Sequence, residues 1–353
     1  MRQINVGVIG TGWCGGIRAQ TAAANPLVDE LHIAEIDPER LAEVRELTSP
    51  ASASADYRDM LAIGNLDAVF ISATPEDTHY PIARDALRAG KHVFLEKPIS
   101  LTLDEADDLI ALAERNGVKF TIGYSQRFNP KYAYIYESLR AGRIGKPVSA
   151  VVSRHITRSL GNKIAGRVRL SPAAMEATHD LDFVLWCMEP AKPIRVYSQS
   201  AYGAMKDVHG REDTQWIMVT MDNGVVLTVG AGWTMPPGYP NYSGTWIEMV
   251  GTDGMLVVDD THRDVILNTM ENGIQLPMSS MPGEPVGHVF AGPMANETIH
   301  FLDAVAGDKP VMVTPAQARK VMEVYIAADL SAERNEPVPL PLNIGHGALA
   351  AAG

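Results

Sequence analysis

Three glycines near the N-terminus constrain the fold more than any other feature of this chain. Gly10, Gly12 and Gly15 stand in the spacing GxGxxG, directly after the apolar run NVGVI and directly before a helical pattern. In such a strand–turn–helix unit, the first glycine permits a tight turn, the second lets a pyrophosphate approach the backbone, and the third lets helix and strand pack closely. The free amides that begin the helix would bind the anion. The pattern predicts a dinucleotide-binding turn.

An acidic residue downstream indicates which dinucleotide binds. Glu35 follows Gly15 by 35 minus 15, or 20, residues and ends the second expected strand, where a carboxylate can accept hydrogen bonds from both ribose hydroxyls. It would repel a 2′-phosphate, so NAD is favoured and NADP is the less favoured cofactor. Asp37 competes for this role because it has the same parity along the strand, but a cap for a helix beginning at Pro38 is its favoured interpretation.

The chain divides into two parts that differ in their pattern of expected secondary structure. Up to about residue 125, β-branched or aromatic runs alternate with helical patterns, as in a doubly wound parallel sheet. From about 147, longer alternating runs between Gly, Asn and Pro turns predict a mostly antiparallel sheet. We expect an α/β fold with a Rossmann domain at 1–125 and an α+β domain with a large open sheet at 126–340, whose closing helices could pack back on the first domain. A tail follows at 341–353.

The individual elements can be placed approximately. In the first domain, strands are expected at 5–10, 30–36, 66–73, 91–97 and 118–124, and helices beginning near 12, 38, 77 and 102. The last of these helices opens with Thr102 and Glu105 in the spacing of a capping box. In the second domain, helices are expected at 172–188, 296–306 and 315–334.

Composition and charge exclude several classes of protein. The formal charge is 30 minus 42, or -12, so the surface would repel nucleic acid. Cys14 and Cys187 have neither the number nor the spacing of a disulfide framework or a zinc site. The sequence contains no signal-peptide pattern and no apolar run long enough to span a membrane. We expect a cytoplasmic protein with no membrane partner.

Several longer motifs resemble one family. They are GTGWCGG at 10–16, SATPEDTHYPIARDALRAGKHVFLEKPISLTLDEA at 72–106, GYSQRFNP at 123–130, THDLDFVLW at 178–186, IHFLDAV at 299–305 and SAERNEPVPL at 331–340. On these motifs, the chain resembles the glucose-fructose oxidoreductase / inositol dehydrogenase / rhizopine catabolism family (Gfo/Idh/MocA) over nearly its whole length. The signature Glu96-Lys97-Pro98 is the most specific part of the resemblance.

The resemblance implies which residues meet the cofactor. Thr74 and Pro75 would line it, His79 would approach it from the following helix, and Gln126 and Arg127 would flank the nicotinamide. The full expected cofactor-binding set is Gly10, Thr11, Gly12, Trp13, Cys14, Gly15, Glu35, Thr74, Pro75, His79, Glu96, Lys97, Gln126 and Arg127. The family also implies an open C-terminal sheet that forms oligomer contacts, so we expect a homodimer or homotetramer.

Lys97 and His179 are the expected proton-handling residues. Hydride transfer from an alcohol needs a base and a positive donor at the substrate oxygen. Lys97 ends the strand 91–97 at the carboxyl edge of the sheet, where burial and the nicotinamide ring would favour its neutral amine and a pairing with Glu96 would oppose this. His179 is a natural proton carrier near neutral pH. A solvated lysine and a structural histidine are the alternatives.

The helix at 172–188 supplies the supporting residues. Projection at about 100° per residue puts Glu176, His179 and Asp182 on one face, so the two carboxylates could orient the imidazole ring. Many family members have an aspartate four residues before the histidine, where this chain has Met175. Glu176 could take over the role of that aspartate. The same residues could in principle bind a metal, but the resemblance implies none and we expect none.

The residues 154–169 are basic in an otherwise acidic chain, which leaves two interpretations open. Arg154 could bind an acidic group of the substrate, such as that of a uronate, because guanidinium groups bind carboxylates. The basic residues could equally pair with carboxylates of the same protein. The expected substrate-binding set is Lys97, Arg154, Met175, Glu176 and His179.

Three functions are compatible with these features. The favoured one is an NAD-dependent dehydrogenase acting on a CH–OH group of a sugar, inositol, polyol or sugar acid. The second, also represented among relatives, is a redox-neutral enzyme that holds NAD tightly and oxidises the sugar transiently during elimination or glycoside cleavage. The third is a non-catalytic NAD-binding regulator, which would require neither Lys97 nor His179.

Overall fold

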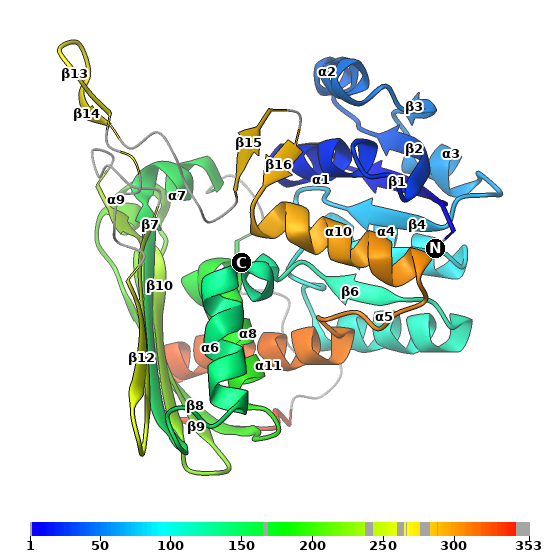
Figure 1. Ribbon diagram of the computed structural model, residues 1–353. Coiled ribbons are helices and arrows are strands. Elements are labelled where there is room, and N and C mark those ends of the chain that lie inside the picture. The colour runs from blue at the N-terminus through cyan, green and yellow to red at the C-terminus, as the bar shows by residue number, and fades with distance from the viewer. Residues whose placement is uncertain are drawn as a thin grey trace. The chain divides into compact units, whose positions relative to one another are not determined.

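The structure, a computed structural model, describes residues 2–164, 169–236, 243–259, 265, 267–275, 283–287 and 289–343. The chain forms two units (Figure 1). The first contains Met1–Phe128 and Ser280–Arg319, and the second contains Asn129–Ser279 and Lys320–Gly353. The expected Rossmann domain, 1–125, lies inside the first unit, which also takes in the later segment. Of the expected tail, residues 344–353 lie outside the described part of the chain.

A parallel sheet is the framework of the first unit. Its strands are β1 (Ile4–Ile9), β2 (Val28–Ala34), β3 (Ser52–Ser54), β4 (Ala68–Ile71), β5 (His92–Leu95) and β6 (Phe120–Ile122), in the order β3-β2-β1-β4-β5-β6. All neighbouring strands are parallel. The strand order reverses between β1 and β4, and open α/β sheets bind their ligands outside the carboxyl ends of the strands at such a switch point. The expectation of a doubly wound sheet is confirmed.

Helices cover this sheet and close its core. They are α1 (Trp13–Ala23), α2 (Pro38–Thr48), α3 (Tyr57–Leu61), α4 (His79–Arg88), α5 (Leu103–Asn116) and α10 (Pro293–Ala306), with 3₁₀ turns η1 (Glu76–Thr78) and η2 (Ser125–Phe128). The capping box of Thr102 and Glu105 begins α5 as predicted. Phe301 of α10 packs edge-on against Phe70 and Phe94, with ring centroids 5.2 and 5.7 Å away. The helix expected at 296–306 therefore contributes to the core of the first unit.

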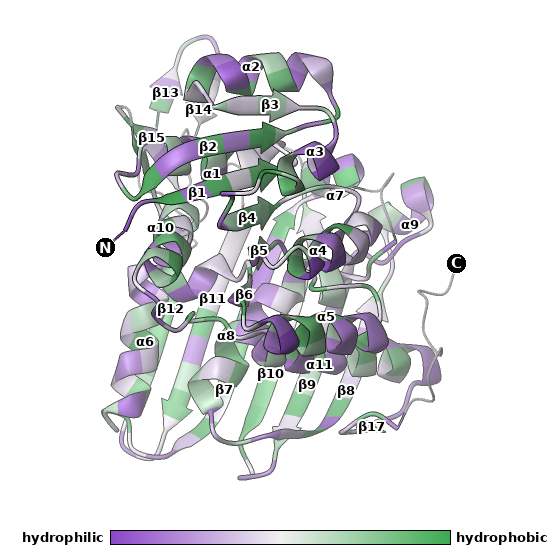
Figure 2. Cartoon of the chain, turned by 90° about the vertical axis from the view of Figure 1, so that its right-hand side faces the viewer, coloured by the Kyte–Doolittle hydropathy of each residue, from purple (hydrophilic) through white to green (hydrophobic). Residues whose placement is uncertain are grey.

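The second unit is built on a seven-stranded sheet. Its strands are β7 (Pro147–Thr157), β8 (Pro193–Ala201), β9 (Thr214–Met221), β10 (Val226–Met235), β11 (Ser243–Gly251), β12 (Met255–Asp259) and β17 (Val338–Pro339), in the order β12-β11-β7-β10-β9-β8-β17. Only β7 and β10 pair in parallel; the other pairs are antiparallel. The expected, mostly antiparallel sheet is confirmed. Hydrophobic and hydrophilic colours alternate along its strands (Figure 2).

Helices cover one face of this second sheet. They include α6 (Pro130–Arg140), α8 (Thr178–Met188) and α11 (Pro315–Arg334), with the short helices α7 (Arg158–Ile164), η3 (Ala173–Ala177) and α9 (Ala204–His209) nearby. Two small hairpins, β13 (Leu267–Thr269) with β14 (Gly273–Gln275) and β15 (Glu284–Val286) with β16 (Val289–Ala291), follow β12 in the sequence. Among the described residues, no helix combines the length and apolar character that a membrane crossing requires.

Candidate active site

The glycine turn between β1 and α1 has the geometry that its spacing predicts. Gly10 has a positive φ of 77°, and a Cβ there would lie 2.7 Å from the backbone of Ala73. A Cβ on Gly15 would lie 1.9 Å from the carbonyl oxygen of Gly10, so helix and strand could not approach each other as they do. A Cβ on Gly12 would meet nothing within 4 Å. Gly12 therefore leaves open space at the start of α1, where a pyrophosphate would lie.

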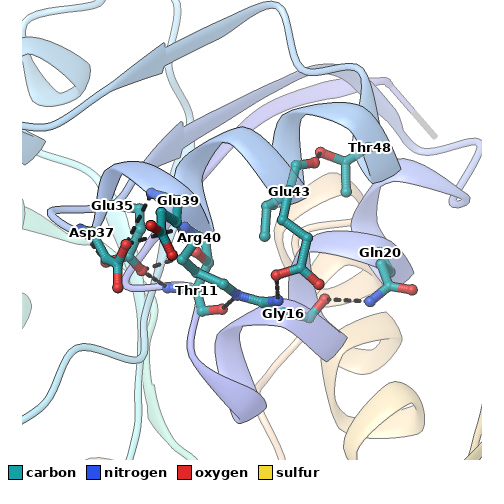
Figure 3. Close-up of polar contacts among 10 residues, drawn as sticks. Thr11, Gly16, Gln20, Glu35, Asp37, Glu39, Arg40, Glu43 and Thr48 are labelled. Carbon is teal, nitrogen blue, oxygen red and sulfur yellow. Dashed lines mark hydrogen bonds and ion pairs between the residues drawn. The ribbon is translucent and has the colours of Figure 1, made fainter.

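Glu35 lies against the middle of this turn, as Figure 3 shows. Its Oε2 accepts hydrogen bonds from the backbone N–H and the hydroxyl of Thr11, at 2.6 and 2.9 Å, and its Oε1 accepts from the N–H of Asp37 at 3.0 Å. The carboxylate therefore stabilises the turn and stands at the carboxyl end of β2. Asp37 caps α2 by accepting from the amides of Glu39 and Arg40, which confirms its favoured interpretation.

Sequence reasoning missed a second partner of Thr11. The Nε of Arg40 donates to the carbonyl oxygen of Thr11 at 2.5 Å, and its Nη1 donates to Glu43 at 2.6 Å. A Cβ on Gly16 would lie 2.3 Å from Nη2 of Arg40, so the guanidinium packs directly over α1 at this glycine. The sequence did contain a hint of this contact. Gly16 directly follows the last glycine of the GxGxxG spacing, and the motif itself does not require a glycine there.

Glu96, beside Lys97, is bound by a buried arginine. Arg18 of α1 donates to Glu96 Oε1 through Nε at 3.1 Å and through Nη2 at a shorter distance. The same Nη2 donates to Glu297 of α10 at 3.0 Å, and Nη1 donates to the hydroxyl of Thr298 at 3.1 Å. The Arg18 side chain is only 1% exposed. This cluster fixes the residue that precedes Lys97, and no sequence motif had indicated Arg18.

Lys97 follows β5 at the carboxyl edge of the sheet and is partly buried. Burial and the Glu96 carboxylate raise the pKa of the Cys14 thiol to about 12, while the positive charges of Arg18 and Lys97 oppose that shift. The Lys97 ammonium therefore lies within electrostatic range of the first turn of α1. The thiol of Cys14 therefore stays protonated at neutral pH. We expect Cys14 to contact the cofactor through its backbone.

His79 supports two loops from inside the protein. Its ring is 1% exposed, with Nδ1 2.7 Å from the carbonyl oxygen of Pro98 and Nε2 3.1 Å from that of Ala73. Both ring nitrogens thus face carbonyls of the protein, and the approach of His79 to the cofactor stays a prediction. Thr74 and Pro75, on the loop that His79 supports, are exposed.

Gln126 and Arg127 lie in η2 and are both buried. The Nη1 of Arg127 donates to the carbonyl oxygen of Met312 at 3.1 Å and to Oε1 of Gln317 at 2.9 Å. This guanidinium therefore ties the end of the N-terminal segment to the segment 312–317. The remaining member of the expected cofactor set, Trp13, begins α1 with its side chain 59% exposed.

In the second unit, the helix expected at 172–188 is divided. A π-helix, η3, spans Ala173–Ala177 and continues directly into α8. The residues from 173 to 188 are buried on all sides apart from the partly exposed His179, so burial does not distinguish the face that was expected to carry Glu176, His179 and Asp182. The ring of Phe183 stacks on Tyr132 of α6 with centroids 4.9 Å apart. The π turn also breaks the spacing of 100° per residue on which the projection depended.

Glu176 and Arg154 pair with each other inside the second unit. Arg154 is 3% exposed, its Nε donates to Asp180 at 2.8 Å, and its Nη1 lies 3.6 Å from the Glu176 carboxylate. Trp233 Nε1 donates to the other oxygen of Glu176 at 2.9 Å. For Arg154, pairing with carboxylates of the same chain is therefore the correct interpretation, and binding of an acidic substrate group is not retained.

Two further expected site residues of this unit, Met175 and Asp182, lie within four positions of His179 in the sequence. Met175 is 5% exposed and Asp182 is fully buried. Lys97 belongs to the first unit, and His179, Glu176 and Asp182 belong to the second. Their common action on a substrate is taken up below as a proposal. Within the described residues, no three or more His, Cys, Asp or Glu side chains are grouped so that they could hold a metal ion.

Asp329 of α11 gives the second unit a pH-dependent stability. Its carboxylate accepts hydrogen bonds from Ser171, which precedes η3, and from Gln215 of β9. Burial raises the pKa of Asp329 from 3.8 to about 6, although both hydrogen bonds lower it. A carboxyl group whose pKa is raised in the folded state contributes its full stabilisation of the fold below its unfolded pKa. This contribution is lost as the pH rises through the folded pKa of about 6.

We therefore expect the wild-type protein to lose stability relative to Asp329→Asn between pH 4 and pH 7. The expected relative change in the free energy of unfolding is about 2 kcal/mol. Urea unfolding of both proteins at the two pH values measures it. An equal difference between the proteins at both pH values would show that Asp329 does not titrate in this range.

Comparison with known proteins identifies two family matches that together cover most of the chain. Residues 4–124 match the family described as oxidoreductase family, NAD-binding Rossmann fold, and residues 132–257 match the GFO/IDH/MocA C-terminal domain. The scyllo-inositol 2-dehydrogenase (NAD(+)) of Bacillus subtilis (strain 168) is 27% identical over 294 residues, which cover 81% of each chain. The UDP-N-acetylglucosamine 3-dehydrogenase of Acidithiobacillus ferrooxidans is 27% identical over 338 residues, covering 94% of this chain and 98% of its own.

A solved structure agrees in fold. The scyllo-inositol dehydrogenase of Lactobacillus casei, with bound NAD(H) and scyllo-inositol, superposes with a TM-score of 0.83 at 22% identity, covering 96% of this chain and 99% of that chain. The two matched families adjoin in sequence and correspond to the parallel and the mostly antiparallel sheet. The chain therefore belongs to the Gfo/Idh/MocA family of oxidoreductases with an NAD-binding Rossmann fold.

Proposed function

We propose that this protein is an NAD-dependent dehydrogenase that moves hydride between nicotinamide and a hydroxyl or keto carbon of a sugar, inositol or sugar acid. The observation that carries the proposal is the glycine turn with Glu35 bonded to Thr11 at the carboxyl end of β2. A carboxylate at this place suits the two hydroxyls of an unmodified ribose. The inositol and sugar-nucleotide dehydrogenases among the relatives support a CH–OH substrate.

The proposed chemistry assigns proton handling to Lys97 and His179. Bound NAD accepts the hydride that leaves the substrate carbon. As that carbon is oxidised, its hydroxyl loses a proton, which His179 accepts while Lys97 donates a hydrogen bond to the same oxygen. Arg18 pairs with Glu96, the residue that precedes Lys97. Glu176 and Asp182 support the helix that carries His179.

A substrate panel with both cofactors tests this function. The purified protein would be mixed with polyols, aldoses, inositols and uronates in the presence of NAD⁺ or NADP⁺, and the absorbance of the reduced cofactor would be followed. We expect NADH to form from NAD⁺ with at least one of these classes. NADPH should form from NADP⁺ more slowly or not at all. A protein that binds NAD⁺ and leaves every member of the panel unoxidised would contradict the proposal.

We also propose that copies of the chain associate through the exposed face of the seven-stranded sheet. This face carries large apolar side chains on neighbouring strands: Trp216 and Met218 of β9, Trp246 of β11 and Val257 of β12 are 43%, 47%, 39% and 44% exposed. The pairings of Trp216 with Gly230, Gly230 with Ser153 and Ser153 with Trp246 place the two tryptophans in one row across the sheet. Such a patch is typical of an interface.

The replacement Met218→Lys is expected to shift the protein from an oligomer towards the monomer, because it would bury an unpaired charge in that interface. Light scattering after size-exclusion chromatography measures the molar mass. The matched control is Met270→Lys, which changes a fully exposed methionine that lies off this sheet, in the turn between β13 and β14. A wild-type protein of 38.2 kDa in solution would contradict the association.

A further inference from the structure

The segment that carries His179 is irregular. The π turn η3 ends at Ala177, α8 begins at Thr178, and His179 is the next residue. The hydrogen bonds of a π turn join residues i and i+5 in place of i and i+4, so the side chains on its two sides do not keep the relative directions of a regular helix. Such turns are rare and frequently lie at functional sites. The place of the His179 ring therefore depends on what holds this turn.

Arg154 of β7 joins the two parts of this segment. Its Nε donates to the carboxylate of Asp180 in α8 at 2.8 Å, and its Nη2 donates to the carbonyl oxygen of Glu176 in η3. Arg154 is 3% exposed, and Asp180 is fully buried. One guanidinium thus binds a residue on each side of His179, in the π turn before it and in the first turn of α8 after it.

The large sheet fixes both the guanidinium and the π turn. Arg154 pairs with Ala231 of β10 and with Thr245 of β11, so its backbone is held from both sides. Trp233, also on β10 and fully buried, donates through Nε1 to Oε1 of Glu176 at 2.9 Å, while Nη1 of Arg154 lies 3.6 Å from Oε2. Both carboxylate oxygens of Glu176 therefore meet side chains of the sheet, which η3 and α8 pack against.

We propose that Arg154 is a positioning residue for His179. By binding Glu176 and Asp180 together, it keeps the π turn in register with the sheet and holds the imidazole where it accepts the substrate proton. The inference rests on the proposed function, in which His179 is that acceptor. A general base acts only within hydrogen-bond reach of the proton, and a displacement of about 1 Å can cost about 10²-fold in rate.

The first test is Arg154→Lys, which keeps the charge but loses the planar fork that reaches Glu176 and Asp180 at the same time. We expect kcat for the best substrate of the panel to fall about tenfold to hundredfold, because the proton acceptor is displaced in the transition state. KM and the affinity for NAD⁺ should stay within about twofold of the wild-type values. An unchanged kcat, or a loss confined to KM, overturns the inference.

The matched control is Arg211→Lys. Arg211 is also 3% exposed, and its guanidinium lies 5.1 Å from the ring centroid of Trp233. It donates to the carbonyl oxygen of Leu170, which precedes η3, and so binds neither neighbour of His179 named above. This variant disturbs a buried arginine in the same unit, and its kcat should stay within about twofold of wild type.

The contact can also be changed from its other end, in case Arg154→Lys does not fold. Asp180→Asn keeps an oxygen that can accept from Nε of Arg154, whereas Asp180→Ala does not, and Glu176 remains as a carboxylate beside the arginine in both. We expect kcat close to the wild-type value in Asp180→Asn and about tenfold lower in Asp180→Ala. Equal kcat values in these two variants would overturn the inference.

A double-mutant cycle with His179 separates positioning from a general loss of structure. If Arg154 acts through the imidazole, Arg154→Lys should change kcat by less than about threefold in a His179→Ala background. Equal losses in both backgrounds, with His179→Ala itself slow, overturn the inference alone. If His179→Ala turns over at a near-normal rate, the proposed role of His179 fails, and the inference fails with it.

Discussion

Replacing Lys97 with alanine is expected to lower kcat/KM for the best substrate of the panel by about 10²-fold or more, while NAD⁺ binding changes little. Lys97 follows β5 at the carboxyl edge of the parallel sheet, and Arg18 fixes its neighbour Glu96. In the proposed mechanism, the ammonium acts on the substrate oxygen from this edge of the sheet. Stopped-flow or steady-state measurement of NADH formation gives the rate, and calorimetric titration gives the affinity for NAD⁺.

The control for this variant is Lys309→Ala, since Lys309 pairs with Asp303 and its side chain is 51% exposed. That protein should retain the wild-type rate. The same experiment separates the three functions considered from the sequence. A redox-neutral enzyme would consume its sugar with no net change in NADH, and a regulator would bind NAD⁺ without any turnover for Lys97 to support. A near-normal rate in Lys97→Ala would end the proposed role of the lysine.

The second large effect is expected for Arg18→Met, which should lower the free energy of unfolding by about 3–5 kcal/mol. The arginine is buried between Glu96 and Glu297, and its guanidinium also lies over the ring of Phe94 at 3.9 Å from the centroid. Its removal would leave two carboxylates close together in the interior with no cation between them. Urea unfolding followed by circular dichroism measures the loss.

Two further variants show whether charge is the cause of that loss. Adding Glu297→Gln to Arg18→Met should restore part of the stability, because one of the two uncompensated charges is removed. Arg319→Met breaks an ion pair with Asp107 whose side chains are 28% and 53% exposed, and it should cost less than about 1 kcal/mol. If the losses in Arg18→Met and Arg319→Met were equal, the buried cluster would have no special part in stability.

The local features of the first unit could be predicted because their chemistry is local. The turn at Gly10 and Gly15, the cap at Asp37 and the capping box of α5 each depend on residues within a few positions of one another. The missed strand β3 consists of Ser52–Ser54, which has no apolar run and is recognised only by its parallel pairing with β2. Short edge strands of this kind are defined by tertiary contacts.

The charged groups around the site could not be predicted because their partners are distant in sequence. Arg18 and Glu297 are separated by 279 positions, and Arg154 and Asp180 by 26. A helix projection likewise placed Glu176 on one face with His179, but it could not indicate that Glu176 is buried through its pairing with Arg154 and Trp233. Buried charges with partners from other elements follow no periodic pattern, so the sequence alone indicates their presence and not their pairing.

The central claim is that Lys97 and His179 act on one substrate oxygen beside the nicotinamide. The most direct test is a crystal structure of the protein with NAD(H) and the substrate that the panel identifies. The account predicts that Lys97 Nζ and a ring nitrogen of His179 both lie within about 3.2 Å of the oxygen on the carbon that faces the nicotinamide. Either group far from that oxygen, or turned away from the ring, would contradict it.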